Sequence, residues 1–499
     1  MKTKKIFNFL LLLGFLSGCD YLDIVPDNLP TLEMAFNNKS SAERFLFTCY
    51  SFVPEHGKIG TDPGMDVGDE VWYYSDNSAD YSNKTTFWIA KGMQNSNEPL
   101  VDYWNGTQWG KAMFVGIRDC NVFIENIEKV PDLSAYDKET WKAEAKVLKA
   151  FYHFWMMRMY GPIPIIKENI PVSAGEDEVR VVRDKIDDIV TYIVSLIDES
   201  VEYLPLNIQN EAAEMGRITR PAAKAIKAKI LAFAASPFFN GNLDYANFKN
   251  AEGEPFFNQV YDNEKWTKAA DACLEAIQCA EEAGHGLYEF VNMSSTQLSD
   301  ETILSLSNRC KVTERWNKEL VWGCGQSGIR DLQVLCQPWL ESNYSSDDRY
   351  HNARNGTFAP TLAVAETFYT KNGVPMDEDK NYDYSKRYTT QVATEADKYY
   401  IQPGYTTAKL HFDREPRFYA TLGFDGSSWY GIGKMDDNDM WYLQAKAKQA
   451  SGKRGNTLYS ITGYFAKKLV RYQNAMVPAS IQIETYPFPI IRLADLYLL

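Results

Sequence analysis

The sequence predicts a mostly α-helical protein, in which tetratricopeptide-like α-hairpins form a scaffold and an irregular, loop-rich subdomain contains short strands. Six segments repeat apolar residues with the 3.6-residue period of a helix that buries one face. Small residues crowd several of these faces, which lets neighbouring helices approach closely and stack as hairpins. In the rest of the chain the periodicity fades and turn-forming residues replace it.

The predicted helices begin and end at recognisable signals. The first opens with Ser40, which can cap a helix, and the second stops before Pro131. A Gly-Pro pair at 161–162 ends the third helix, and Pro205 follows the fourth. The fifth begins with a Thr-x-Pro sequence, and the sixth shares its Ala-rich composition. In chain order, the helices are expected over residues 40–52, 109–130, 135–160, 184–204, 219–235 and 266–283.

Two long segments, 53–103 and 292–480, have little periodicity and are rich in Gly, Asn, Asp, Ser and Tyr. Long loops inside a compact protein are often functional. Within the second segment, Glu319–Trp322 has the pattern of an interior strand, so Trp322 is expected in the core. The predicted division is a helical scaffold over 40–290 that holds a binding loop over 53–103, and a loop-rich C-terminal region over 291–499.

The first 19 residues have the features of a bacterial lipoprotein signal. Three lysines precede an apolar run from Ile6 to Leu16, which is too short to span a bilayer as a helix. Small residues then precede Cys19 in a pattern that resembles the lipobox, so residues 1–18 are expected to be cleaved and Cys19 acylated. Residues 19–39 would form the lipid anchor and tether. Because no later segment has 18 consecutive apolar residues, lipid alone is expected to hold the body at the membrane.

The residues after Cys19 indicate where the protein resides. The acidic start Asp20-Tyr21-Leu22-Asp23 resembles the surface-export signals of some Gram-negative lipoproteins. The sequence therefore predicts a protein that is lipid-anchored in the cell outer membrane and faces the exterior.

Charge and motifs argue against several classes of function. The formal net charge is −14 without a basic block, which argues against nucleic-acid binding. Seven cysteines remain after Cys19, without a CxxC pair or a Cys/His cluster, and we interpret them as buried thiols. No HExxH, GxSxG or P-loop string is present, so the sequence predicts no metal, no cofactor and no catalytic residue. Two acidic groups are interpreted as solvated turns, or as loose Ca²⁺ sites, at Asp66, Asp69 and Glu70 and at Asp436, Asp437 and Asp439.

Several strings resemble the SusD/RagB family of outer-membrane nutrient-binding lipoproteins. In that family's order they are YLD…P (21–26), AEAK…PIPII (143–166), GRIT…AASP (216–237), EPRFYATL (415–422), TGYFAKKLV (462–470) and PIIRLADLYL (489–498). The resemblance implies a tetratricopeptide-like scaffold without enzymatic activity. It also implies a SusC-like TonB-dependent transporter as partner, over which the protein sits as a lid. The family continues past the last string, whereas this sequence stops at Leu499 inside a scaffold helix, so we hypothesise a truncated C-terminus.

Aromatic residues in the two loop segments are the candidate ligand contacts. Aromatic residues make up 14% of the chain, and sugar rings bury their C–H faces against Trp and Tyr while polar side chains pair with the hydroxyl groups. The family resemblance implies ligand contacts from roughly the same two segments. The candidates are Trp72, Tyr73, Asn77, Tyr81 and Trp88 in the first segment and Arg315, Trp316, Trp339, Asn343 and Tyr344 in the second.

Other prominent side chains are expected to be structural. His153 lies beside aromatic residues in a predicted helix and is interpreted as a core residue with satisfied hydrogen bonds. Arg414, Pro416, Arg417 and Arg492 are expected to be structural, with the arginines bridging carbonyl or carboxylate groups and so holding loops in place. The tryptophans expected to pack in the helical core are Trp104, Trp109, Trp141 and Trp155.

The sequence thus favours a surface-exposed, non-enzymatic lipoprotein that captures an oligosaccharide or polysaccharide and hands it to the transporter. A peptide is the alternative ligand. The alternative functions are a lipid-anchored glycoside hydrolase and a tetratricopeptide adaptor that binds only protein.

Overall fold

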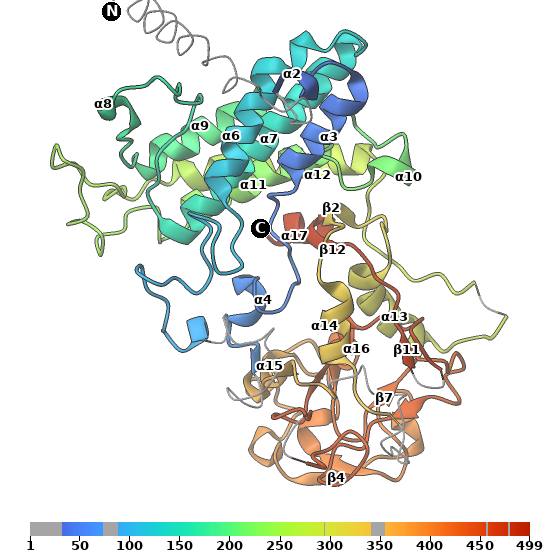
Figure 1. Ribbon diagram of the computed structural model, residues 1–499. Helices are drawn as coiled ribbons and strands as arrows, with labels where there is room; N and C mark the ends of the chain where they lie inside the picture. The colour runs from blue at the N-terminus through green and yellow to red at the C-terminus, as the bar shows by residue number, and fades with distance from the viewer. Residues whose placement is uncertain (1–31, 73–87, 294, 341–354, 456–457, 478–479) are drawn as a thin grey trace, which may run out of the picture.

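The computed structural model describes residues 32–72, 88–293, 295–340, 355–455, 458–477 and 480–499. Long helices of the N-terminal half form one end of the molecule, and short strands, loops and further helices form the other (Figure 1). The predicted mostly helical fold class is confirmed. The predicted signal peptide and Cys19 lie outside the described residues. No helix in the described ranges combines the length and the apolarity that crossing a bilayer requires.

Six long helices occupy the segments in which the periodicity predicted them. They are α3 (Lys39–Tyr50), α6 (Met113–Asn126), α7 (Ala135–Tyr160), α9 (Ile186–Asp198), α11 (Arg220–Ala235) and α12 (Glu264–Glu282). At the start of α7, the Ser134 hydroxyl accepts a hydrogen bond from the Asp137 amide (3.0 Å), and Gly161 with φ of +70° follows its last residue. Thr219 caps α11 in the same way. Local caps therefore account for the starts of α7 and α11.

Successive scaffold helices pack on one another. α3 packs on α6, α6 on α7, α7 on α9, α9 on α11, and α11 on α12. Ala223 and Ala228 of α11 are fully buried, so small residues do allow close approach of the helices. Trp141 and Trp155 of α7 are buried in this core, as predicted, and Trp104 packs half-buried against it.

Antiparallel two-stranded ladders organise the C-terminal region. The pairs are β1 (Val71–Trp72) with β3 (Ala359–Pro360), β2 (Leu320–Cys324) with β12 (Phe488–Arg492), β4 (Thr390–Val392) with β5 (Thr406–Ala408), β6 (Leu422–Gly423) with β9 (Phe465–Ala466), β7 (Ser428–Trp429) with β8 (Trp441–Tyr442), and β10 (Ala475–Val477) with β11 (Ser480–Gln482). Short helices connect the elements: α2 (Leu32–Ala35), α4 (Pro63–Asp66), α8 (Glu176–Val179), α10 (Glu211–Glu214), α15 (Leu362–Thr367) and α16 (Pro416–Thr421).

The ladder of β2 and β12 joins the C-terminal region to the scaffold. β2 is the interior strand predicted at 319–322, and Trp322 is buried as expected. Its register places Phe488 opposite Cys324 and Arg492 opposite Leu320. After β12 the chain forms α17 (Leu493–Leu498), which packs against α12.

Besides the six-residue helices α15 and α16, two longer helices lie in the segment that was expected to be irregular. They are α13 (Asp300–Thr313) and α14 (Ile329–Cys336). The buried face of α13 includes the polar residues Thr302, Arg309 and Thr313. Its apolar residues alone therefore do not recur with the 3.6-residue period by which a helix is predicted. α14 is only eight residues long, which is too short for a periodic pattern to stand out.

The second scaffold helix begins later than predicted, and this changes the place of Trp109. The helix starts at Met113, and Trp109 lies in the preceding loop, where it is 72% exposed. The expectation that Trp109 packs in the core is therefore wrong. The reason is a turn that Asp102 organises by accepting the backbone amides of Trp104 (2.9 Å) and Asn105 (3.0 Å).

Two of the three arginines predicted to be structural, Arg414 and Arg492, bridge groups of separate segments, whereas the exposed Arg417 pairs with its near neighbour Glu415 (2.6 Å). Arg492 pairs with Glu319 (3.1 Å) and with Asp495 (2.9 Å), which ties β2 to the start of α17. The buried guanidinium of Arg414 donates to four backbone carbonyls, those of Ala365 (2.8 Å), Phe368 (2.6 Å), Leu410 (2.9 Å) and Tyr369 (3.3 Å).

His153 and the cysteines are core residues, as predicted. The Nδ1–H of His153 donates to the Lys149 carbonyl (2.8 Å), and its Nε2 accepts from the Ile166 amide (3.2 Å). Burial lowers the pKa of His153 to about 4, so the ring is neutral at pH 7. The seven cysteines among the described residues are buried free thiols.

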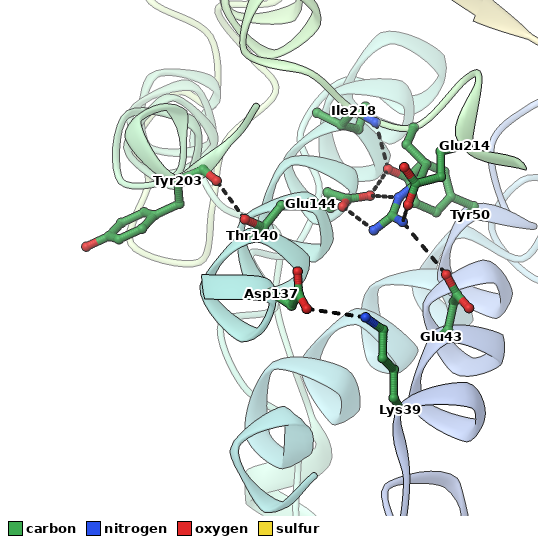
Figure 2. Close-up of polar contacts among 10 residues, drawn as sticks. Lys39, Glu43, Tyr50, Asp137, Thr140, Glu144, Tyr203, Glu214 and Ile218 are labelled. Carbon is green, nitrogen blue, oxygen red and sulfur yellow. Dashed lines mark hydrogen bonds and ion pairs between the residues drawn. The ribbon is translucent and has the colours of Figure 1, made fainter. Parts of the chain in front are cut away.

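A buried ion pair links three parts of the scaffold (Figure 2). Glu144 of α7 accepts hydrogen bonds from Arg217 at Nη2 (2.6 Å) and Nε (3.1 Å), just before α11. The Tyr50 hydroxyl of α3 donates to Glu144 (2.5 Å) and accepts from the Ile218 amide (2.8 Å). Arg217 also pairs with Glu214 (2.7 Å). Burial raises the pKa of Glu144 even though Arg217 and Tyr50 act to lower it, so the charged carboxylate depends on these partners.

Replacing Arg217 with Ala should lower the free energy of unfolding by about 3–5 kcal/mol, because it leaves the Glu144 charge buried without its cation. Urea denaturation followed by circular dichroism measures the change. The double variant Glu144→Leu/Arg217→Met should be clearly more stable than Arg217→Ala, since it removes both charges. A loss below about 1 kcal/mol in Arg217→Ala would show that the network is not a stability determinant.

Candidate functional site

A cavity of about 400 Å³ opens between the scaffold and the segment that leads into β2. We call it the Trp316 cavity. Its lining comes from three places: the connection between α9 and α11, the end of α12, and the turn between α13 and β2 together with β2 itself. The lining residues are Leu206, Asn207, Ile208, Glu211, Met215, Gly216, Arg217, Thr219, Ala283, Gly284, His285, Trp316, Asn317, Lys318, Leu320, Val321, Trp322 and Gly323.

The half-buried Trp316 ring lies directly against two glycines. A Cβ atom at Gly216 would lie 3.4 Å from the ring atom Cη2, and one at Gly323 would lie 3.2 Å from Cζ3. Gly216 also has φ of +98°, a conformation that other residues rarely adopt. Trp316 itself has φ of +47°, which is unusual for a bulky residue and is found preferentially at functional sites. The backbone therefore fixes the place of the ring.

Trp322 and Asn317 stabilise, from the core side, the cavity wall that Trp316, Gly216 and Gly323 form. The Trp322 Nε1–H donates to the Gly216 carbonyl (3.1 Å). The Asn317 side chain donates to the Glu314 carbonyl (3.0 Å) and accepts from the Glu319 amide (3.0 Å), which closes the turn between α13 and β2. The wall is thus a rigid part of the fold.

Polar side chains of different charge surround this aromatic wall. The His285 Nδ1–H donates to the Lys318 carbonyl (3.0 Å), and burial lowers the pKa of His285 below its usual value. The ring is therefore neutral at pH 7, with Nε2 as an acceptor. Arg217 adds a cation that is already engaged in the buried network, and Glu211 adds an exposed carboxylate.

This set of groups suits a neutral polar ligand that has an apolar face. An indole covers C–H surface, while amide, imidazole and carboxylate groups pair with hydroxyls. Hydrolysis of a glycosidic bond needs two carboxyl groups that flank it. Among the described residues that line the cavity, Glu211 is the only acidic one. Within the described ranges, no group of three or more His, Cys, Asp or Glu residues is placed to hold a metal ion.

Trp72 and Trp88 of the predicted binding loop do not line this cavity. Trp72 lies at the end of β1 opposite Ala359 of β3 and is 39% exposed. Trp88 lies in a short helical turn and is 38% exposed. Both rings have the exposure that stacking requires, and their contact with a ligand stays a prediction.

A tightly bonded segment precedes β1, and Asp62 organises it. The buried carboxylate of Asp62 accepts hydrogen bonds from the amides of Gly57 (2.9 Å) and Gly64 (3.0 Å), and His56 lies 3.7 Å away. Burial acts to raise the pKa of Asp62, but His56 and the backbone amides outweigh it and hold the pKa below its usual value. Asp62 is therefore ionised at neutral pH and holds the turn that leads to Trp72.

Two carboxylates that were interpreted as solvated are buried instead. Asp66 accepts from the Gly60 amide (2.7 Å), and Asp437 accepts from the amide and the hydroxyl of Ser299 (both 2.7 Å). The interpretation is wrong for these two because carboxylates in turns can turn inward and bind polar groups of the chain. The exposed members of the two groups are Asp69, Glu70, Asp436 and Asp439.

The remaining predicted contacts are scattered. Arg315 is exposed beside Trp316, whereas Trp339 is only 6% exposed, with its backbone bonded to Asn355 (2.9 Å) and Ser451 (2.6 Å). Among the predicted contacts that the structure describes, Trp316 alone lines the cavity. Five predicted contacts lie outside the described residues: Tyr73, Asn77, Tyr81, Asn343 and Tyr344.

Sequence reasoning did not identify most of the cavity. Asn207, Glu211 and His285 come from connections without a motif, and only the fold brings them beside Trp316. The one signal in the sequence is Gly216 in the string GRIT, since a glycine there meets both a positive φ and a close aromatic contact.

Family models match both halves of the chain. Residues 20–231 match a model described as "Starch-binding associating with outer membrane", and residues 330–499 match the model of the SusD family. A comparison with curated proteins gave no match.

Solved structures share the fold. The protein BT4246 is 27% identical, with 92% of this chain and 78% of that chain aligned at a TM-score of 0.75. A SusD-like protein (BF3747) from Bacteroides fragilis is 17% identical, with 93% of this chain and 74% of that chain aligned at a TM-score of 0.63. A SusD-like carbohydrate binding protein (BF0978) from the same species is 17% identical, with 93% and 73% aligned at a TM-score of 0.53.

Replacing Asp62 with Asn should reduce the decrease in the free energy of unfolding between pH 7 and pH 3. Because the pKa of Asp62 is lower in the folded than in the unfolded protein, its contribution is present above about pH 4 and is lost as the pH falls through the folded pKa. Urea denaturation at pH 7, 5, 4 and 3 should show the wild type losing more stability than Asp62→Asn. The exposed Asp69→Asn is the control and should follow the wild type. Parallel curves for Asp62→Asn and the wild type would contradict this role.

Proposed function

The chain belongs to the SusD/RagB family, and we propose on that basis that it captures an oligosaccharide or polysaccharide at the cell surface and hands it to a SusC-like TonB-dependent transporter. The observation that carries the proposal is the Trp316 cavity. It combines a backbone-fixed indole with amide, imidazole, ammonium and carboxylate groups, which is the set of groups that a sugar ring needs. The family description as starch-binding supports the same class of ligand.

We further propose that Cys19 carries lipid and that the protein faces outward from the outer membrane. The sequence features of residues 1–23 and the family description, which names association with the outer membrane, support this location. The SusC-like partner rests on the family membership. A lid over a transporter needs both an anchor that keeps it at the membrane and a site that takes up cargo, and the chain offers a candidate for each.

Binding without cleavage is part of the proposal. Arg217 lines the cavity, and the carboxylates of Glu144 and Glu214 are paired with it and are thereby occupied. That arrangement favours a binding protein over a hydrolase, which would need a second free carboxyl beside Glu211.

Replacing Trp316 with Ala should weaken glycan binding about tenfold, because the indole face that covers the sugar is lost. Native gels cast with soluble starch, laminarin, arabinoxylan, galactan or mannan identify the polysaccharide that retards the protein, and isothermal titration calorimetry measures the change. Trp316→Phe should keep most of the affinity. Trp266→Ala is the matched control, since Trp266 is a 38% exposed tryptophan on α12 that does not line the cavity.

Two results would overturn the proposed function. Released sugars after incubation with the retarding polysaccharide, detected by chromatography, would identify a hydrolase. Absence of retardation by every polysaccharide, together with binding to a protein partner, would identify an adaptor.

A further inference from the structure

The loop Asp102–Gly110, which we call the Trp109 loop, presents the most exposed aromatic side chain among the described residues. Trp109 is 72% exposed, more than any other Trp, Tyr or Phe in those ranges. It does not line the Trp316 cavity. A large indole left in water is unfavourable, so its exposure points to a surface that covers it in another state of the protein.

Hydrogen bonds to Asp102 build the Trp109 loop into a fixed shape. The buried Asp102 carboxylate accepts from the amides of Trp104 and Asn105 and from the Thr107 hydroxyl (2.8 Å). The Gly106 amide donates to the Asp102 carbonyl (3.1 Å). The carboxylate that receives these bonds stays ionised at neutral pH, since they outweigh the effect of burial and lower the pKa of Asp102. The loop is therefore a rigid support.

The backbone holds Trp109 outward in an unusual conformation. Gln108 and Trp109 have φ of +49° and +71°, so two successive residues other than glycine occupy the left-handed region. Gly110 lies so close to Asp102 that a Cβ atom there would be 1.9 Å from the Asp102 carbonyl oxygen. The chain must therefore turn sharply at this point, and the turn directs the indole away from the core. Strain of this kind is found where it serves a function.

The neighbours of Trp109 indicate the chemistry of its ligand. Asn105, Thr107 and Gln108, close to Trp109 in the same loop, are exposed, so the loop presents amide and hydroxyl side chains along with the indole. A protein-binding hot spot is centred in a wider apolar patch, whereas a sugar needs one aromatic face and hydrogen-bonding groups at its edge. The composition of the loop favours the sugar.

The position of the loop connects it with the first predicted binding segment. The Tyr103 hydroxyl donates to the Thr61 carbonyl (2.9 Å), in the segment that leads to Trp72. Lys111, directly after the loop, donates to the Ser51 carbonyl (3.0 Å). The Trp109 loop is thus hydrogen-bonded to the segment before β1, and the residue after the loop is hydrogen-bonded to the end of α3.

We propose that the Trp109 loop is a carbohydrate-stacking subsite separate from the Trp316 cavity, which engages a sugar unit of a long glycan. The inference rests on the proposed glycan-binding function and adds a second point of contact to it. A subsite outside the cavity contributes to the affinity for a polysaccharide and little to that for a short oligosaccharide, since a short chain occupies one subsite only.

The test compares Trp109→Ala with the wild type on the polysaccharide that retards the full chain in native gels, and on a trisaccharide prepared from it. We expect affinity for the polysaccharide to fall about tenfold and affinity for the trisaccharide to change less than about twofold. Trp109→Phe should stay within about threefold of the wild type, since it keeps an aromatic face. Tyr136→Ala is the matched control, a 68% exposed aromatic at the start of α7, and should not change either affinity.

Asp102→Ala provides a second variant, because it removes the support of the loop while leaving Trp109 in place. It should weaken polysaccharide binding as Trp109→Ala does, with thermal unfolding recorded to verify that both variants fold. Unchanged polysaccharide affinity in Trp109→Ala, with a wild type that binds, would overturn the subsite and leave the proposed function standing. Loss of co-purification with an outer-membrane protein at unchanged glycan affinity would assign Trp109 to a protein interface and also overturn it. A wild type that binds no glycan would overturn both proposals.

Discussion

The ion pair between Glu144 and Arg217 is the interaction on which the arrangement of the scaffold and the cavity depends. It joins α7 to the turn before α11, and Tyr50 extends it to α3, so that three elements distant in sequence share one set of hydrogen bonds. Because both ends are buried, the pair is stable only while all of these partners stay in place. The same turn contains Gly216, against which the Trp316 ring lies. The pair therefore positions one wall of the candidate site.

The C-terminal region meets a different constraint. Its strands are short, so many backbone carbonyls have no ladder partner, and buried cations bind them instead. The Lys467 ammonium donates to the carbonyls of Tyr419 and Ser428 (both 2.9 Å), and Arg309 donates to those of Tyr430 and Val470 (both 3.0 Å). Burial lowers the pKa of Lys467 and that of Arg309, to about 10 for the latter. Arg414 plays the same part near α16. Irregular backbone is thus stabilised from inside by hydrogen-bond donors.

Aromatic residues lie both in the core and at the surface of this protein, and the exposed fraction of the side chain distinguishes packing residues from candidate ligand contacts. Trp141, Trp155 and Trp322 are buried in the core that the helices share, while Trp109 is held in water by a loop with a strained backbone. Trp316 is intermediate, since two glycines allow its ring to form a cavity wall. The number of aromatic residues therefore does not predict ligand binding. The backbone conformation that places each ring is the more informative feature.

The sequence by itself determined the helical scaffold, because caps and the 3.6-residue period act locally, and α7 has the predicted bounds Ala135–Tyr160. The sequence also predicted that the cysteines are buried thiols and that Arg414 is structural, because a thiol is small and apolar and a guanidinium has several hydrogen-bond donors. Only the tertiary structure decided the site. α13 was missed because polar residues such as Arg309 form its buried face, and the lining of the Trp316 cavity comes from connections that meet only after α9, α11, α12 and β2 have packed. Trp109 lay at the edge of a helical period, yet it lies in the turn that Asp102 organises, and α6 begins only at Met113. Such contacts join residues through space, so no local pattern contains them.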